Sequence, residues 1–409
     1  MKVMFAAPYI YENKYKEFSK NSTGFGYMVR DILNDISETD DIFLVTHQFT
    51  CGHKEKYIIL KHTKGDVLRH FKIKDLFRGL YDSLTNHVDI SIRLRYLYYF
   101  LDKGYFVQAV KDIQPDIVHI HGLTYQTKPY IEACEELRVP YLVTLHGLNG
   151  LNDSVALPDN EKKYEKEALT LLTERKRVVT VVSSGIKRRI AEEYRIPVDH
   201  VYVVLNGVSS YKGVLGDERI REEAFHIVCI GNISKHKNQL QLIRAYNLLN
   251  DEEKKYIKIF FFGGDSENIN IGKEIKKYGF SENIIYYGFV PKKEMLKIWS
   301  IADLNVVLSK EEGFGLSMAE GYQYGVPTMT FEDLDAVEDL YNQDAMFLMR
   351  SRRDEDVAAG IRECRERQWN RKKIIEWSKN FELKKTISEY KVIYKEIIRN
   401  GVGWKRKEL

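Results

Sequence analysis

Short apolar runs rich in Val, Ile and Phe recur along this chain, and stretches of helical composition separate them. Near-continuous apolar strands that alternate with helices are typical of a parallel sheet covered on both faces. One series is KVMFAA, IFLVTH, DIVHIHG, YLVTLHG, VVTVVSS and VYVVLNG, and a second is FHIVCIG, IKIFFFGG, NIIYYGF, ADLNVVLS, VPTMTF and AMFLM. Residues 206–225, between the two series, are rich in Gly, Ser and charge, which is typical of a linker. We therefore expect two doubly wound α/β domains.

The length and composition agree with this expectation. A chain of 409 residues and 48.0 kDa favours two domains over one. Hydrophobic residues make up 44% and charged residues 30%, as in soluble globular proteins. The sequence has neither a membrane-spanning run nor a secretory signal, so we expect a cytoplasmic protein. The four cysteines are far apart, which predicts reduced and mostly buried thiols, not a disulfide framework or a metal site.

The stretch SKEEGFGLSMAEGYQYGVPTM combines glycines with two carboxylates. The apolar run before it predicts a strand, and the residues after the glycines predict a helix that ends at Gly325, just before Pro327. In an α/β sheet such a loop lies at the carboxyl end of a strand, where backbone N–H groups of the helix N-terminus can bind an anion. A glycine-rich turn alone is as often an ordinary loop. Glu312 and Glu320 make the prediction of a ligand site more specific.

Several motifs in this order resemble one family. The spacing of Glu312 and Glu320 in EGFGL…E, the unit FHIVCIGNISKHKNQLQLIRAY, the strands PDIVHIHG and VTLHG, and the loop NSTGFGYMVRDI are similar to those of the retaining, nucleotide-sugar-dependent glycosyltransferases of family 4. The resemblance covers essentially the whole chain. It implies the GT-B fold, in which two Rossmann-like doubly wound domains face a central cleft.

The resemblance also implies a division of the chain. Residues 1–208 would form an acceptor domain and residues 209–385 a donor domain. A last amphipathic helix, expected within 386–409, has apolar residues on one face that must cover apolar surface on its own domain or back on the N-terminal one. These residues are Ile387, Tyr390, Tyr394, Ile397 and Ile398.

The activity implied by the resemblance is transfer of a sugar from a nucleoside-diphosphate sugar to a hydroxyl group, with retention at the anomeric carbon. The leaving diphosphate gains negative charge in the transition state, so cationic and backbone donors should stabilise it without a divalent metal or other cofactor. Uridine is the commonest donor base in the family, and a glycan, lipid-linked or protein acceptor is implied. A front-face mechanism, in which the departing phosphate accepts the acceptor proton, fits a site with no second carboxylate across the sugar.

The motif matches assign the site residues. The implied catalytic residues are Glu312, beside the reacting sugar, His146 and the phosphate-binding Lys237. Glu320 would accept hydrogen bonds from the ribose hydroxyls. The implied donor-binding residues are Gly24, Asn232, Lys237, Gly313, Phe314, Gly315, Leu316 and Glu320. The family often has arginine where Asn232 stands, which weakens one expected diphosphate contact. It often has Gly-Gly where Thr23-Gly24 stand, which leaves the glycine that approaches the phosphate in place.

Other polar residues are expected to be structural. His119 and His121 are two apart on one predicted strand and therefore share a face. The acids of DLD (residues 333–335) and DED (residues 354–356) lie where helices should begin, so N-terminal capping explains them better than a metal site. Ser183 and Ser184 could touch the donor, but helix capping explains them as well.

The segment from 53 to 111 is basic, with twelve Lys and Arg against six Asp and Glu. Basic residues mix with aromatic and aliphatic ones over residues 66–106, which is compatible with contact to anionic lipid on the inner face of a membrane. A protein acceptor or partner subunit is the alternative, and ordinary helices with charges toward water would give the same composition. No recognisable nucleic-acid motif accompanies the charge.

Three other functions were compared with transfer. A non-catalytic GT-B partner of another glycosyltransferase would tend to lose the charged donor residues, which this chain keeps at Lys237, Glu312 and Glu320. A phosphorylase would need a lysine for pyridoxal phosphate and is usually far longer. A nucleotide-sugar epimerase would carry additional carboxylates that we do not find in the sequence. We therefore expect a transferase.

Overall fold

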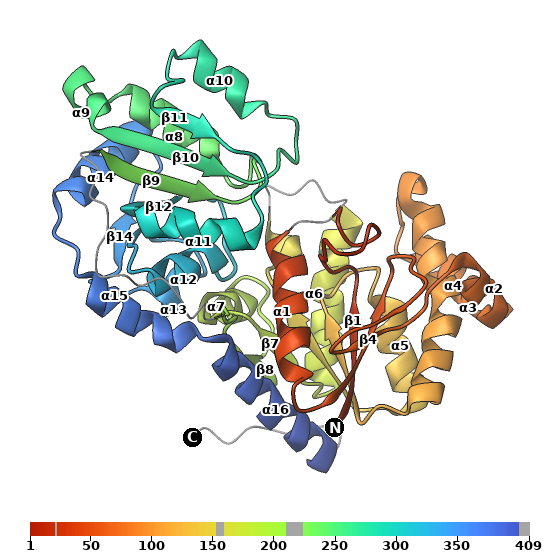
Figure 1. Cartoon of the computed structure of the whole chain (residues 1–409). Coiled ribbons are helices and arrows are strands. Elements are labelled where there is room, and N and C mark those ends of the chain that lie inside the picture. The colour runs from red at the N-terminus through yellow and green to blue at the C-terminus, as the bar shows by residue number, and fades with distance from the viewer. Residues whose placement is uncertain (21–22, 153–158, 210–223, 401–409) are drawn as a thin grey trace. The chain divides into compact units, whose positions relative to one another are not determined.

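The computed structural model describes residues 1–20, 23–152, 159–209 and 224–400. By internal contacts the chain divides into two compact units. Unit 1 comprises Met1–Leu205 together with the chain from Thr386, and unit 2 comprises Asn206–Lys385. The sequence-based boundaries fall at 208/209 and 385/386. Most of the predicted linker, residues 206–225, lies outside the described residues. Elements of both units can be followed in Figure 1.

Unit 1 is built on an eight-stranded sheet of order β3-β4-β2-β1-β5-β6-β7-β8. All pairings are parallel except that of β3 with β4, so the edge of the sheet departs from the predicted all-parallel pattern. β3 and β4 have two residues each and were not predicted. The strands are β1 (Lys2–Ala7), β2 (Asp41–Thr46), β3 (His53–Lys54), β4 (Ile58–Ile59), β5 (Ile117–His121), β6 (Tyr141–Leu145), β7 (Val179–Val181) and β8 (Val201–Val203).

Helices cover both faces of the unit 1 sheet, and every residue of its central strands β5 and β6 is buried. Tyr390 and Tyr394 of the last helix pack against His119, and Phe25 of the first helix packs against His146. The helices of unit 1 are α1 (Gly24–Ile36), α2 (Lys64–His70), α3 (Ile73–Thr85), α4 (Ile90–Ile113), α5 (Lys128–Leu137), the 3₁₀ turn η1 (Asn149–Leu151), α6 (Asp159–Glu174), α7 (Ser184–Glu192) and most of α16 (Leu383–Asn400).

Two glycines allow α2, α3 and α4 to approach one another closely. A Cβ atom on Gly104 of α4 would lie 2.0 Å from the carbonyl oxygen of His70 at the end of α2. A Cβ atom on Gly79 of α3 would lie 2.9 Å from the side chain of Phe100 in α4. Only residues without a side chain fit at these two contacts, so the glycines fix the packing distance of the three helices.

Unit 2 contains a six-stranded, all-parallel sheet of order β11-β10-β9-β12-β13-β14. All six predicted strands are present. They are β9 (Phe225–Ile230), β10 (Ile257–Phe262), β11 (Ile284–Tyr286), β12 (Leu304–Val307), β13 (Thr328–Phe331) and β14 (Met346–Met349). The helices are α8 (Gln239–Asn247), α9 (Asp251–Lys255), α10 (Ile271–Lys277), α11 (Lys292–Ile301), α12 (Leu316–Gln323), α13 (Val337–Leu340), α14 (Asp354–Glu366), α15 (Arg371–Ser378) and η2 (Lys379–Phe381).

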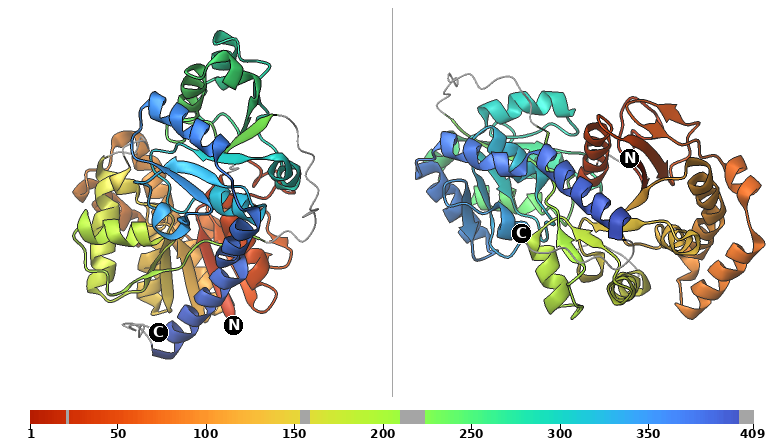
Figure 2. Two further views of the ribbon diagram at one scale, coloured as in Figure 1. Left: turned by 90° about the vertical axis from the view of Figure 1, so that its left-hand side faces the viewer. Right: turned by 90° about the horizontal axis from the view of Figure 1, so that it is seen from below.

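The chain returns to unit 1 along α16, as the crossing-back alternative predicted (Figures 1 and 2). The Tyr394 hydroxyl lies 2.6 Å from Nδ1 of His119, and the Thr386 hydroxyl donates to the carbonyl of Leu205 at 2.8 Å. The predicted apolar face of α16 is right at four of five positions. Ile398 is 39% exposed, and Ile393, which was not predicted, is fully buried in its place.

Candidate functional site

In unit 2, two loops meet where the strand order of the sheet reverses. β9 pairs with β12, and the chain leaves both strands at their carboxyl ends. The loop after β9 leads to α8 and carries Asn232 and Lys237. The loop after β12 leads to α12 and carries Glu312 and the two glycines around Phe314. This reversal point is where open α/β sheets bind ligands.

The loop after β9 is held by a tight backbone approach and by one buried amide. Gly263 has φ 139°, and a Cβ atom on it would lie 2.1 Å from the carbonyl oxygen of Gly231, so only glycine fits there. The side-chain amide of Gln239 donates to the carbonyl of Asn232 at 3.0 Å and to that of Gly231 at 3.3 Å. Gln239 is buried. The loop is therefore preorganised, and it directs Lys237 toward the second loop.

Lys237 forms an ion pair with Glu312 on the second loop. The Ser309 hydroxyl donates to the same carboxylate oxygen at 3.1 Å, and the backbone carbonyl of Glu312 accepts from the N–H of Ala336 at 3.0 Å. Burial alone would raise the pKa of Glu312, but the positive charge and hydrogen bond of Lys237 hold it below its usual value. Glu312 is therefore a carboxylate at neutral pH. The structure brings together two of the three residues predicted to be catalytic.

The remaining residues of the glycine loop have different surroundings. Gly315 has φ 82°, a left-handed conformation, at the N-cap of α12, and Leu316 begins the helix. Glu320 lies in the second turn of α12 and is partly buried. Phe314 is buried and packs edge-on against Phe381, with ring centroids 6.1 Å apart. The phenyl ring therefore belongs to the core of unit 2, and only the backbone of Phe314 remains as a predicted donor contact.

Arg352 supports this loop and was not predicted. Its guanidinium donates to the carbonyl of Ser309 at 3.0 Å, pairs with Asp333 at 2.7 Å, and lies 4.1 Å from the ring centroid of Phe331. No local motif marks it, because its partners are 19 and 43 residues away along the chain. It fixes the start of the loop that carries Glu312.

The acids of residues 333–335 and 354–356 are not the N-cap residues of α13 and α14. The N-cap of α14 is Arg353, which makes no side-chain cap, and the N-cap of α13 is Ala336. Asp354 and Asp356 lie in the first turn of α14 and pair with Arg244 and Arg353. The capping interpretation is therefore wrong in detail, because arginines compete for these carboxylates. It is right for Ser183, whose hydroxyl accepts from the N–H of Ile186.

In unit 1 the strand order reverses between β1 and β5, and the predicted residues lie at that end of the sheet. Gly24 is the first residue of α1, and the N-cap Thr23 accepts from Gly26 N–H at 3.2 Å. His146 follows β6 directly. Its Nε2 lies 3.0 Å from Nδ1 of His121, the last residue of β5. His121 therefore orients His146, a relation that was not predicted.

The histidines of this end of the sheet are neutral. Burial lowers the pKa of His146 to about 3. Burial also lowers the pKa of His119 and His121 far below the usual value, since a charged imidazole would be desolvated there. The rings of His119 and His121 stack with centroids 4.1 Å apart, which confirms that they share a face. Neutral His146 can donate or accept one hydrogen bond but is a weak proton acceptor at neutral pH.

One group of side chains in the described part of the chain has the donor types of a metal site. Glu17, Cys51 and His53 of unit 1 offer ligand atoms within 4.8 Å of one another. His53 Nε2 lies 2.8 Å from a Glu17 carboxylate oxygen. Cys51 is exposed, whereas Cys134, Cys229 and Cys364 are buried free thiols, as predicted for most of the four. None of the predicted site residues belongs to this group.

Two family models match the sequence. Residues 215–381 match glycosyl transferases group 1, and residues 80–210 match glycosyltransferase family 4. The chain is 24% identical over 241 residues to an uncharacterized 41.2 kDa protein in the cps region of Klebsiella pneumoniae. It is 26% identical over 257 residues to the serotype-specific mannosyltransferase WbdA of Escherichia coli. These stretches cover 54% and 58% of this chain, and 62% and 31% of the two relatives.

Solved structures share the fold over nearly the whole chain. A glycosyltransferase from Rickettsia africae superposes with a TM-score of 0.70 at 16% identity, covering 98% of this chain and 99% of its own. Sucrose-phosphate synthase from Thermosynechococcus elongatus gives a TM-score of 0.75 at 12% identity, with 98% and 100% covered. Together with the two parallel Rossmann-like sheets, these similarities confirm the GT-B fold. The chain therefore has the GT-B fold, and residues 80–210 and 215–381 match two glycosyltransferase family models.

Proposed function

We propose that this protein transfers a sugar, with retention of anomeric configuration, from a nucleoside-diphosphate sugar to a hydroxyl of a glycan, lipid-linked or protein acceptor. The ion pair of Lys237 and Glu312 carries the proposal. It places one cation and one carboxylate on the two loops at the reversal point of the unit 2 sheet. A diphosphate needs the cation, and the hydroxyls of a sugar need the carboxylate as an acceptor.

The proposed roles are those that the motif resemblance implies, and the position of each residue is compatible with them. Lys237 and the N-terminus of α12 stabilise the charge that develops on the leaving diphosphate. Glu312 contacts the transferred sugar, and Glu320 accepts hydrogen bonds from the ribose. Gly24, at the start of α1, offers backbone N–H groups to phosphate. His146 acts as a neutral hydrogen-bonding group and not as an acid–base catalyst, because burial lowers its pKa to about 3.

The proposal needs no divalent metal. In a front-face reaction the departing phosphate takes the proton of the acceptor hydroxyl while the new glycosidic bond forms on the same face. The positive charge of Lys237 and the backbone N–H groups replace the cation that a metal would supply. Uridine is proposed as the base because it is the commonest in the family, and a solved neighbour, HepE of Anabaena, was crystallised with UDP and glucose.

A cell-surface polysaccharide is the proposed acceptor class. The support is the printed role of the relatives: WbdA is a serotype-specific mannosyltransferase, and another relative is a poly(glycerol-phosphate) alpha-glucosyltransferase of Bacillus subtilis. We infer that this chain also extends a surface glycan. The transferred sugar follows from the donor that the experiment below identifies.

The test is thermal unfolding with a panel of nucleoside diphosphates and their sugars in EDTA. We expect one nucleotide to raise Tm in the wild type and to lose most of this effect in Glu320→Ala. Glu363→Ala, an exposed carboxylate on α14 of the same unit, is the matched control and should respond like the wild type. Slow hydrolysis of the identified donor, followed by NMR of the sugar as it is released, then tests retention.

A non-catalytic partner of another glycosyltransferase is the second candidate. The neutral Asn232, where the family often has arginine, favours it. This candidate predicts no Tm shift with any nucleotide, and that result would remove the donor-site assignment.

A further inference from the structure

Helix α3 of unit 1 turns polar residues toward the protein and several apolar residues toward solvent. It buries Asp75, Asp82 and Ser83 together with Gly79. Leu76 and Leu80 are partly buried, but four other large apolar side chains face solvent, each between 59% and 64% exposed. We call this set the apolar stripe; its members are Ile73, Phe77, Tyr81 and Leu84. Their spacing of four, four and three residues puts them on one face of the helix. The alternative of ordinary helices whose apolar residues all pack inward therefore does not describe α3.

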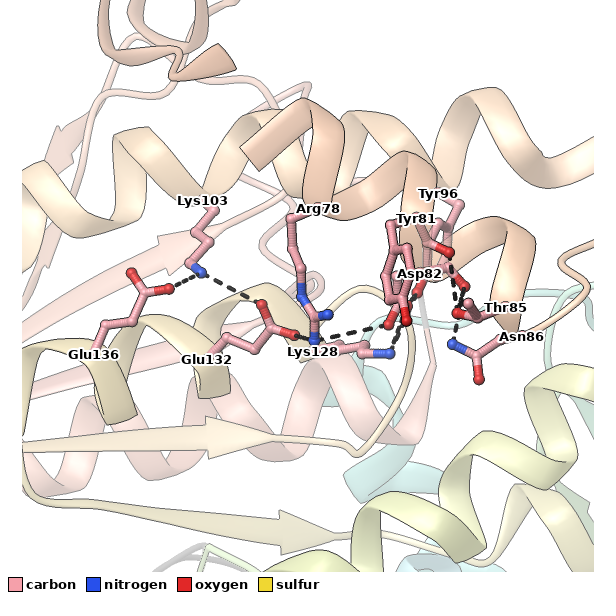
Figure 3. A network of polar contacts seen from close by, with 10 residues as sticks. All are labelled: Arg78, Tyr81, Asp82, Thr85, Asn86, Tyr96, Lys103, Lys128, Glu132 and Glu136. Carbon is pink, nitrogen blue, oxygen red and sulfur yellow. Dashed lines mark hydrogen bonds and ion pairs between the residues drawn. The ribbon is translucent and has the colours of Figure 1, made fainter. Parts of the chain in front are cut away.

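A polar network fixes this orientation of α3 (Figure 3). Asp82 accepts a hydrogen bond from the Tyr96 hydroxyl and pairs with Lys128 of α5 at 2.6 Å. Arg78 pairs with Glu132 of α5 at 3.1 Å. Rotation of the helix to bury the apolar stripe would expose Asp82 and leave Lys128 without this partner, at a cost typical of a broken buried ion pair. The outward stripe is therefore a property of the folded unit.

The same segment presents positive charge outward. Residues 64–95 contain seven Lys and Arg and four Asp. Two of the four carboxylates, Asp75 and Asp82, are buried, and Asp66 closes the capping box of α2 with Thr63. Lys72 and Lys74, which flank the start of the apolar stripe, are exposed. The surface around the stripe is therefore more basic than the composition alone indicates.

The two helices that flank α3 in the sequence also carry exposed apolar side chains. Leu68 in α2 is 74% exposed, and Ile90 and Leu94 at the start of α4 are 80% and 82% exposed. Exposed apolar side chains gathered in this way mark interaction sites on folded proteins. A helix with an outward apolar stripe and basic flanks matches the pattern of helices that lie in a membrane interface.

We propose that α3 docks unit 1 on the surface of an anionic phospholipid bilayer. The apolar stripe would enter the boundary between headgroups and acyl chains, and Lys72 and Lys74 would bind the phosphate groups of the lipids. A lipid surface fits better than a protein partner because lysine is depleted at protein interfaces. The contact would be peripheral, since among the described residues no helix has the length and apolarity to cross a membrane. The inference is independent of the donor chemistry.

Vesicle co-sedimentation without donor tests the proposal. The full chain should bind phosphatidylcholine vesicles that contain phosphatidylglycerol, bind pure phosphatidylcholine weakly, and dissociate at high salt. Phe77→Ser/Leu84→Ser should weaken binding about 100-fold, since two apolar side chains no longer insert. Lys72→Gln/Lys74→Gln should weaken binding to anionic vesicles about 20-fold and leave binding to neutral vesicles unchanged.

The matched control is Leu171→Ser/Val392→Ser, two apolar residues of unit 1 that are 44% and 46% exposed and lie outside this segment. It should bind like the wild type. Thermal unfolding should show that all three variants fold, because the altered side chains are exposed. Absence of vesicle binding by the wild type would overturn the proposal, as would equal losses in Phe77→Ser/Leu84→Ser and the control. A dimer in light scattering that Phe77→Ser/Leu84→Ser dissociates, without vesicle binding, would assign the stripe to a second copy instead. Nucleotide-induced Tm shifts report the donor site separately.

Discussion

Lys237 and Glu312 form an ion pair, and substituting one or the other residue should change nucleotide affinity in opposite directions. In the chain without donor, Lys237 is neutralised by Glu312. A diphosphate must therefore compete with this carboxylate for the same ammonium group. Lys237→Met removes the cation that both partners need. Glu312→Gln removes the competitor and leaves the cation available to phosphate.

The magnitudes follow from the exposure of the pair. The side chains of Lys237 and Glu312 are 29% and 16% exposed, so solvent screens the pair partly and it contributes about 1 kcal/mol. A charge-assisted hydrogen bond to phosphate contributes about 1.5–3 kcal/mol. Lys237→Met should therefore weaken binding of the nucleoside diphosphate by about 10-fold or more. Glu312→Gln should strengthen it about fivefold.

Isothermal titration calorimetry with the nucleoside diphosphate, without sugar, isolates the phosphate contact from any contact of Glu312 with the sugar. Lys235→Met is the matched control, since Lys235 lies two residues away on the same loop and is exposed. It should bind like the wild type. The same variants should both lose sugar transfer. Equal weakening by Lys237→Met and Glu312→Gln, or no difference between Lys237→Met and Lys235→Met, would refute the competition.

Three further outcomes can be measured by urea or thermal unfolding. Gly104→Ala should destabilise the protein by about 1–3 kcal/mol, because its Cβ would meet the His70 carbonyl at 2.0 Å, whereas Gly272→Ala, whose Cβ meets nothing within 4 Å, should be near neutral. Tyr394→Phe should cost about 1–3 kcal/mol, because Nδ1 of buried His119 loses its hydrogen-bond partner, while nucleotide affinity stays unchanged. The free energy of unfolding should fall as pH drops below 6.5, because His146 binds a proton in the unfolded chain but not in the folded protein until about pH 3. His146→Asn should reduce the slope of this free energy against pH by up to about 1.4 kcal/mol per pH unit. An unchanged slope would contradict the low pKa of His146.

The strands of both sheets could be predicted because most of them are buried on both faces and therefore read as continuous apolar runs. β3 and β4 could not, since two residues carry no periodicity. Phe314 reads as part of a ligand loop from its glycine neighbours, but its partner Phe381 is 67 residues away and gives no local signal. The paired loops of Lys237 and Glu312 were predicted through their motifs and lie together in the structure.

The orientation of α3 could not be predicted for a different reason. Apolar periodicity identifies a helix face but not the side that meets the protein. In α3 the deciding contacts are polar and distant: Asp82 with Lys128, and Arg78 with Glu132. The sequence leaves both orientations open, and the partners on α5 decide between them.

Because α16 belongs mostly to unit 1, the two units are completed in a fixed order during translation. Unit 2 is one continuous segment, Asn206–Lys385, and it leaves the ribosome before the residues that complete unit 1. Until Tyr390 and Tyr394 emerge, the face of the nascent sheet that holds His119 and Thr144 lacks its cover. Unit 2 can therefore mature during translation, whereas unit 1 must wait as an open intermediate. A nascent chain arrested after residue 385 should leave that face of the sheet accessible to chaperones, and release of the last helix should end this exposure.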